Sequence, residues 1–180
     1  MLYTSKSAEQ AAILSVAQKM CTAIRTAPKT QGKDYIDCCI ATGKEIAALA
    51  RKMEEIGTEY EKAFILRDAG NLRASQAVIL VGVKNVYHGL DAVCRYCGFD
   101  GCRACGDQGG ECVYGPIDLG IAIGSAVALA SDHHIDNRVM FSVGRAALDL
   151  GYLPEGYGCI LGIPLSISGK SPYFDRKKST

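Results

Sequence analysis

Five of the nine cysteines of this 180-residue chain lie in one short segment, CRYCGFDGCRACGDQGGEC. The spacing is C-x2-C-x4-C-x2-C-x6-C, formed by Cys94, Cys97, Cys102, Cys105 and Cys112. Two cysteines at C-x2-C spacing lie within one turn of chain and can bind the same metal centre. The segment has few apolar residues around which to fold, so its order would come from whatever the thiols hold. We therefore expect a metal-dependent lobe.

Three roles are considered for these cysteines: disulfide bonds, a zinc site and an iron–sulfur cluster. Disulfides are disfavoured because the number is odd and because the N-terminus has no apolar segment behind a basic start, as a secretory signal would have. Zinc is an alternative, since four thiolates suit a tetrahedral site, but only four residues separate the two C-x2-C pairs, against ~15–20 in a zinc ribbon. An iron–sulfur cluster accepts thiolates from a longer looping segment and is the favoured hypothesis.

Length and charge limit the other classes of function. A chain of 180 residues predicts a single domain, 1–180, with a cysteine-rich insert over 88–115. A net charge of +1 gives no electrostatic case for nucleic acid or an anionic membrane as a partner. The longest apolar run, 117–130, contains Asp118 and is shorter than the ~20 residues of a membrane span. We expect a cytoplasmic location.

Apolar periodicity predicts more helix than strand. We expect strands over 76–83 and 157–169, and helices over 7–25, 35–55, 59–66, 116–131 and 137–151. Ser7 and Gln10 suggest a capping box for the first helix, and 67–75 suggests a polar loop. This content predicts an α+β fold, with a small buried sheet surrounded by helices and the cysteine-rich lobe on one side.

The segment CRYCGFDGC, 94–102, resembles the C-x-x-C-G-x-x-x-C signature of small [4Fe–4S] domains in anaerobic electron-transfer proteins. The resemblance implies that Cys94, Cys97 and Cys102 are ligands of a cluster. Such domains take a fourth cysteine from further along the chain, which here is Cys112 or, as the alternative, Cys105. The gap before the last cysteine is shorter than in the usual pattern.

Four further blocks extend the resemblance to nearly the whole chain. RTAPKTQGKDYID, LRDAGNLRASQAVILVG, DLGIAIGSAVALASDHHIDNRVMFSVG and GIPLSISGKSPYFDRK together resemble a prokaryotic family of uncharacterised proteins containing a ferredoxin domain. What this resemblance implies is an iron–sulfur protein with no established activity.

The frame around the cysteines is also similar to flavin-dependent nitroreductases. APKTQG resembles their A-P-S-x-x-N loop, IDLGIAIGSAVALA their central helix, and LGIPLSISGKSPYFDR their final strand. The resemblance implies a nitroreductase-like homodimer with FMN at the subunit interface. The cationic residues placed by this resemblance near the flavin phosphate are Arg25, Lys29, Lys170 and Arg176. The paired-arginine start of that family is absent here.

The other cysteines and the histidines have simpler interpretations. We interpret the four remaining cysteines as small buried hydrophobes, with a vicinal redox pair as the alternative for the two adjacent ones: Cys21, Cys38, Cys39 and Cys159. His133 and His134 fall in a polar loop between helices. His88, just before the cluster, is an alternative ligand for a zinc site.

We therefore predict an iron–sulfur protein, with a [4Fe–4S] cluster, that acts in electron transfer and exchanges electrons with a redox partner protein or a small-molecule acceptor. With FMN bound, it would be a flavin and iron–sulfur oxidoreductase. The alternative is a zinc-stabilised structural or interaction protein without redox activity.

Overall fold

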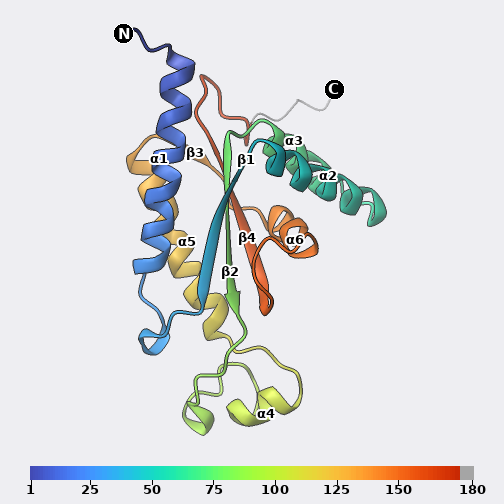
Figure 1. Ribbon diagram of the computed structural model, residues 1–180. Coiled ribbons are helices and arrows are strands. Elements are labelled where there is room, and N and C mark those ends of the chain that lie inside the picture. The colour runs from blue at the N-terminus through green and yellow to red at the C-terminus, as the bar shows by residue number, and fades with distance from the viewer. Residues whose placement is uncertain (175–180) are drawn as a thin grey trace.

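A computed structural model describes residues 1–174 of the chain, and Figure 1 shows helices on both faces of a central sheet. The sheet is antiparallel, in the order β1-β2-β4-β3. Its strands are β1 (Ile36–Thr42), β2 (Ala77–Lys84), β3 (Asp136–Asn137) and β4 (Tyr157–Ser166). The helices are α1 (Ser5–Thr26), α2 (Lys44–Glu59), α3 (Ala63–Arg73), α4 (Cys102–Asp107), α5 (Tyr114–Asp132) and α6 (Phe141–Asp149).

β2 lies between β1 and β4 and is apolar along almost its whole length because helices cover both faces of the sheet. Successive side chains of a strand point to opposite faces. Ile79, Val81 and Val83 therefore join α1 and α5 in one apolar cluster. Val78 and Leu80 join α2, α3 and α6 in a second cluster on the other face.

α6 lies unusually close to β4. A Cβ added to Gly144 would come 1.8 Å from the carbonyl oxygen of Ile160, and one added to Gly162 would come 2.3 Å from Val143. Only glycine at both positions allows the helix backbone to rest on the strand backbone. This contact packs α6 directly against β4 at the second apolar cluster.

Several predicted elements are confirmed. The helix over 7–25 is α1, the helix over 116–131 is α5, and the strands over 76–83 and 157–169 are β2 and β4. The α+β class with a small sheet among helices is also confirmed. α1 begins two residues earlier than predicted, and its cap is Thr4, whose Oγ1 accepts from Ser7 N at 3.2 Å, so the Ser7–Gln10 capping box was wrong.

The region 35–73 was predicted wrongly. Residues 35–55 form β1 and then α2, joined at Gly43 with φ +52°, instead of one helix. β1 pairs residue for residue with β2, and these hydrogen bonds outweigh the helical periodicity of its neighbours. The helix predicted over 59–66 is divided between α2 and α3, and α3 continues through the predicted loop to Arg73.

The region before β4 also differs from the prediction in its boundaries. Of the helix predicted over 137–151, only 141–149 is helical, because Asp136 and Asn137 pair with the end of β4 as β3. His133 and His134 lie exposed in the turn after α5, as expected of a polar loop.

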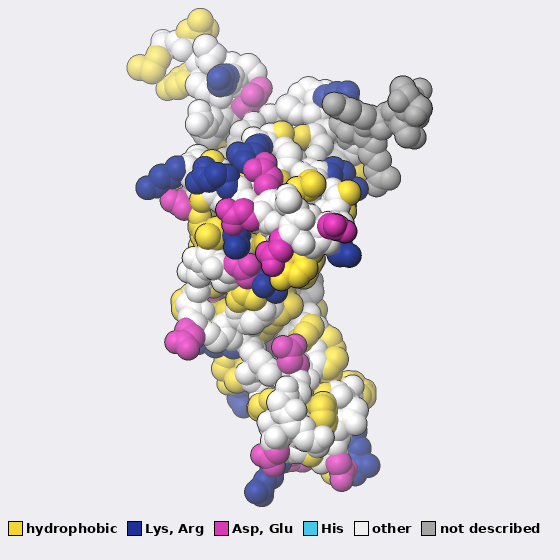
Figure 2. Space-filling view, turned by 90° about the vertical axis from the view of Figure 1, so that its right-hand side faces the viewer, with side chains coloured by type: hydrophobic (Ala, Val, Ile, Leu, Met, Phe, Trp, Pro, Cys, Tyr) yellow, Lys and Arg dark blue, Asp and Glu magenta, His cyan; other side chains and the backbone are white. Residues whose placement is uncertain are grey.

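Two surface features bear on partners. Figure 2 views the side of α2 and α3, where basic and acidic side chains are intermingled without a patch of one sign. By length and composition α5 is long and apolar enough to cross a membrane. Core helices pass the same test, and α5 buries Leu119, Ala122, Ile123 and Ala126 against the sheet and α1.

Candidate metal centre in the cysteine lobe

Residues 85–113 form a lobe between the end of β2 and the start of α5, and Figure 1 shows that it projects beyond one end of the sheet. We call it the cysteine lobe, and we call the sheet with α1, α2, α3, α5 and α6 the frame. The lobe contains only one short helix, α4, and a 3₁₀ turn at Asp91–Val93. Six of its residues have positive φ: Gly89, Asp91, Arg95, Gly98, Gly101 and Gly109. The backbone therefore curls repeatedly instead of extending.

All five lobe cysteines line a single pocket, which is partly open to solvent. Cys105 is fully buried and Cys112 is 9% exposed, whereas Cys94, Cys97 and Cys102 are half-buried. None of the nine cysteines forms a disulfide. The fold thus brings together every cysteine that the sequence pattern singled out.

The thiols are linked to one another and to an aromatic ring. Burial, with a hydrogen bond donated to Cys97, raises the pKa of the Cys105 thiol to about 11. Burial also raises the pKa of Tyr114, whose hydroxyl donates to Cys94. Tyr114 in turn stacks on Tyr96 with ring centroids 6.0 Å apart. These contacts keep the sulfur atoms facing the pocket.

Side chains around the pocket hold its backbone in place. Asp91 Oδ1 accepts from Cys102 N, and Asn85 Oδ1 accepts from Cys112 N, each at 3.1 Å. Tyr87 donates to the carbonyl oxygen of Gly110 at 2.7 Å. A Cβ at Gly110 would come 2.5 Å from the ring of Phe99 and 2.9 Å from Cys105 Sγ, so this position requires glycine. The lobe is therefore built closely around its sulfur atoms.

His88 is also part of the pocket wall. It is 7% exposed, and its Nδ1 has no hydrogen-bond partner among residues 1–174. Sequence reasoning considered His88 only as an alternative zinc ligand. A buried imidazole nitrogen without a partner, on a side chain that lines the pocket of the thiols, fits a pocket that holds a charged or hydrogen-bonding group.

The donor set fits an iron–sulfur cluster. Cysteine thiolates are the ordinary ligands of such clusters, and the five thiols and His88 surround one space. Four thiolates on one zinc ion would be roughly 3.8 Å from one another, given Zn–S bonds of ~2.3 Å. Among residues 1–174, no group of three or more His, Cys, Asp or Glu side chains is arranged to hold a single metal ion.

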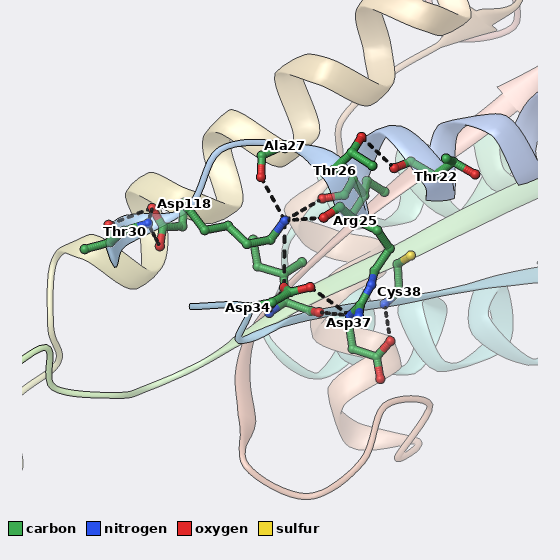
Figure 3. Close-up of polar contacts among 12 residues, drawn as sticks. Thr22, Arg25, Thr26, Ala27, Thr30, Asp34, Asp37, Cys38 and Asp118 are labelled. Carbon is green, nitrogen blue, oxygen red and sulfur yellow. Dashed lines mark hydrogen bonds and ion pairs between the residues drawn. The ribbon is translucent and has the colours of Figure 1, made fainter. Parts of the chain in front are cut away.

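The loop after α1, residues 27–34, lies next to the lobe. Gln31 Nε2 donates to the carbonyl oxygen of His88 at 3.1 Å. Figure 3 shows Thr30 held by the buried Asp118 of α5, which accepts from Thr30 N at 3.0 Å and from Thr30 Oγ1 at 2.9 Å. No pattern in the sequence indicates this contact, because its partners are 88 residues apart.

Lys29 and Arg25, expected near a flavin phosphate, both bind groups of their own chain. The Lys29 ammonium, 4% exposed, donates to the carbonyl oxygens of Ile24, Arg25 and Ala27. Arg25 forms an ion pair with Asp34 at 3.0 Å and donates to the carbonyl oxygen of Ile36 (Figure 3). The two cations therefore bind carbonyl and carboxylate oxygens of the chain at the C-terminal end of α1.

The two other predicted phosphate residues do not join them. Lys170 is exposed and follows β4 at the end of the sheet opposite to the loop 27–34. Arg176 lies outside the described residues. Because the described cations are separated by the length of the sheet, one chain does not assemble a phosphate site from them, and flavin binding through these residues stays a prediction.

Comparison with known proteins places the chain in a family. Residues 108–176 match the family described as "Uncharacterized protein containing a ferredoxin domain". An uncharacterised protein of Archaeoglobus fulgidus is 40% identical over 184 residues, which cover 98% of each chain. The chain belongs to this ferredoxin-domain family. The matched segment includes Cys112 but begins after the other four lobe cysteines.

Several solved structures that resemble the fold are nitroreductases. A Lactococcus lactis nitroreductase in complex with nicotinic acid has a TM-score of 0.59 at 15% identity, over 87% of this chain and 81% of its own. A Clostridium novyi nitroreductase family protein has 0.54 at 14%, over 85% and 73%. An FMN-dependent nitroreductase of Clostridium difficile has 0.54 at 13%, over 87% and 76%. The family member described here therefore has a nitroreductase-like fold.

The four frame cysteines do not form a comparable cluster. Cys38 and Cys39 lie on β1 and not on a helix as predicted, so their side chains point to opposite faces of the sheet. They cannot act as a vicinal pair. Cys38 accepts a hydrogen bond from the thiol of Cys21, whereas Cys39 lies 3.9 Å from the carbonyl oxygen of Tyr152. Cys159 lies on β4.

Proposed function

We propose that this protein transfers electrons through an iron–sulfur cluster held in the cysteine lobe. The observation that carries the proposal is the convergence of five thiols on one pocket in a segment with little apolar core of its own. Cys94, Cys97, Cys102 and Cys112 would hold the cluster, which we propose to be [4Fe–4S]. When bound, such a cluster accepts and donates single electrons.

Cys105 is proposed as a fifth thiol that supports the ligands instead of binding iron. Its thiol is fully buried in α4 and donates to Cys97. Cys112 instead lies where the lobe returns to α5, and its N–H is held by Asn85. Serine variants of all five cysteines test this assignment. We expect loss of iron in four of them and full iron content in Cys105→Ser.

The direct test is purification without oxygen, followed by an absorption spectrum and by counts of iron, sulfide and zinc. Broad absorption near 400 nm with matching iron and sulfide is expected. A colourless protein with one zinc per chain would contradict the proposal and favour the structural alternative.

A flavin-linked oxidoreductase is the second candidate. Two observations favour it: the nitroreductase-like fold, and the contact of Gln31 with His88, which joins the loop similar to the nitroreductase flavin loop to the cluster pocket. Against it, Lys29 and Arg25 are engaged within the chain. Titration of the purified protein with FMN tests it. Quenching of flavin fluorescence that saturates at one FMN per chain would support binding.

We also propose that the protein forms a homodimer through α5. The exposed side of this helix carries Ile117 and Ile121, which are 42% and 41% exposed, and nothing lies within 4 Å of a Cβ added at Gly120 or Gly124. An apolar stripe with glycines allows close approach by a second copy. Sedimentation of Ile121→Glu should give a monomer, while Leu148→Glu on α6 should remain dimeric. A monomeric wild type would contradict this.

The electron partner is proposed to be a redox protein or a small-molecule acceptor that approaches the lobe. The pocket is partly open, and its three half-buried cysteines lie nearest to solvent. Neither nucleic acid nor a membrane is proposed as a partner, and a cytoplasmic location remains our proposal.

A further inference from the structure

His88 occupies a position that packing alone does not explain. It follows β2, and its carbonyl oxygen accepts from Gln31 at 3.1 Å. Its ring meets Tyr35 and Tyr114 edge-on, with ring centroids 6.2 and 5.9 Å away. The imidazole is thus held between Tyr35, which precedes β1, and Tyr114, the first residue of α5, and His88 lines the pocket.

The Nδ1 atom of this ring is buried without a partner among residues 1–174. Leaving a buried polar group unpaired is energetically unfavourable. The only carboxylate lining the pocket within those residues, that of Asp91, already accepts from Cys102 N. The five cysteines line the same pocket as this ring. The unpartnered nitrogen therefore belongs to a buried ring that shares its pocket with the thiols.

We infer that His88 donates a hydrogen bond from Nδ1 to a sulfur atom of the bound cluster or of one ligating cysteine. This inference rests on the proposed iron–sulfur centre and adds a residue that adjusts its redox potential. The reduced cluster carries one more negative charge than the oxidised one, so a donor to sulfur stabilises the reduced form more and raises the potential. His88 is thus a positioning and tuning residue and is not counted among the ligands.

The test compares midpoint potentials of anaerobically purified, iron-loaded proteins. His88→Leu removes the donor while keeping an apolar side chain of similar reach, and His88→Gln keeps an N–H. His133→Leu, in the exposed turn after α5, is the matched control. We expect His88→Leu to hold wild-type iron with a lower potential. At fixed potential the ratio of reduced to oxidised cluster should fall about tenfold, a shift of ~59 mV for one electron.

The remaining outcomes separate the hypotheses. His88→Gln should lie closer to wild type than His88→Leu, and His133→Leu should not differ from it. Loss of iron in His88→Leu alone, with His88→Gln intact, also supports a donor. An unchanged potential in iron-loaded His88→Leu, or loss of iron in both His88 variants, overturns this inference but not the proposed function. A wild-type protein without iron overturns both.

Discussion

In the cysteine lobe, five thiols line one pocket and few other side chains are buried, whereas in the frame four cysteines are dispersed among two large apolar clusters. Between residues 91 and 112 the buried residues are Gly101, Cys105 and Cys112. The frame instead buries whole faces of β2 and of the helices packed on it. The same residue type therefore serves as a prospective ligand in one region and as a small apolar side chain in the other.

The difference shows where each region obtains its order. Burial of apolar area at about 25 cal/mol per Å² supports the frame without any bound group. The lobe has little such area, so its order depends on backbone hydrogen bonds, on glycines at positive φ, and on the group that its thiols bind. The two regions should therefore respond differently to metal removal and to mutation.

Removal of the metal is expected to have the largest effect, and only on the lobe. Chelation of iron should release the amides of residues 85–113, whose exchange with deuterium should accelerate at least about tenfold. Amides of β2 and β4 should keep their protection, because apolar packing holds them. Hydrogen exchange followed by mass spectrometry, with and without chelator, measures both in one sample. Equal acceleration in the sheet would show that the metal also supports the frame.

The frame should instead lose stability when its closest backbone contact, between α6 and β4, is disturbed. Gly144→Ala places a Cβ 1.8 Å from the carbonyl oxygen of Ile160, which is backbone and cannot rotate away. We expect a loss of about 3–5 kcal/mol of unfolding free energy, measured by urea denaturation. Gly70→Ala in α3 is the matched control: nothing lies within 4 Å of its added Cβ, so a gain of about 0.5–1 kcal/mol is expected. Similar losses in both would contradict the assigned contact.

The cysteine lobe could be predicted from the sequence because its chemistry is contiguous. Five cysteines within 94–112 indicate a shared centre, whatever fold surrounds them. The order of helices and strands was predictable where an apolar run was long, as in α1, α5 and β2. The nitroreductase-like fold was predicted from a resemblance and not from periodicity. Structural comparison confirms it.

What the sequence concealed was set by partners distant in the chain. β1 looked helical because IDCCIAT adjoins the periodic segment of α2, and only its pairing with β2, some forty residues on, makes it a strand. Asp118 interrupted an apolar run without indicating that Thr30 would satisfy it. The burial of His88 could not be predicted, because the two rings that contact it belong to Tyr35, just before β1, and to Tyr114, the first residue of α5.

The Asp118–Thr30 contact should have an intermediate effect. Asp118→Asn replaces a charged acceptor of two Thr30 donors by a neutral amide in a buried site, which should cost about 1–3 kcal/mol of unfolding free energy. Thr30→Ser keeps both donors and is the control, with a small expected change. Iron content should remain at the wild-type level in both. Loss of iron in Asp118→Asn alone would show that the loop at 27–34 also supports the lobe.

The smallest expected effect distinguishes two neighbouring frame cysteines. The thiol of Cys21 donates to Cys38 and lowers the pKa of Cys38, whereas burial raises the pKa of Cys39 to about 11. Alkylation proceeds through the thiolate. In the iron-loaded protein at pH 8, iodoacetamide should therefore label Cys38 at least about tenfold faster than Cys39, and labelling of Cys39 should accelerate as the pH rises towards 11. Peptide mass spectrometry reports both rates. Cys21→Ala removes the donor, so it should slow the labelling of Cys38 and leave the labelling of Cys39 unchanged. Equal labelling rates for Cys38 and Cys39 in the wild type would mean that the two faces of β1 give their thiols the same environment.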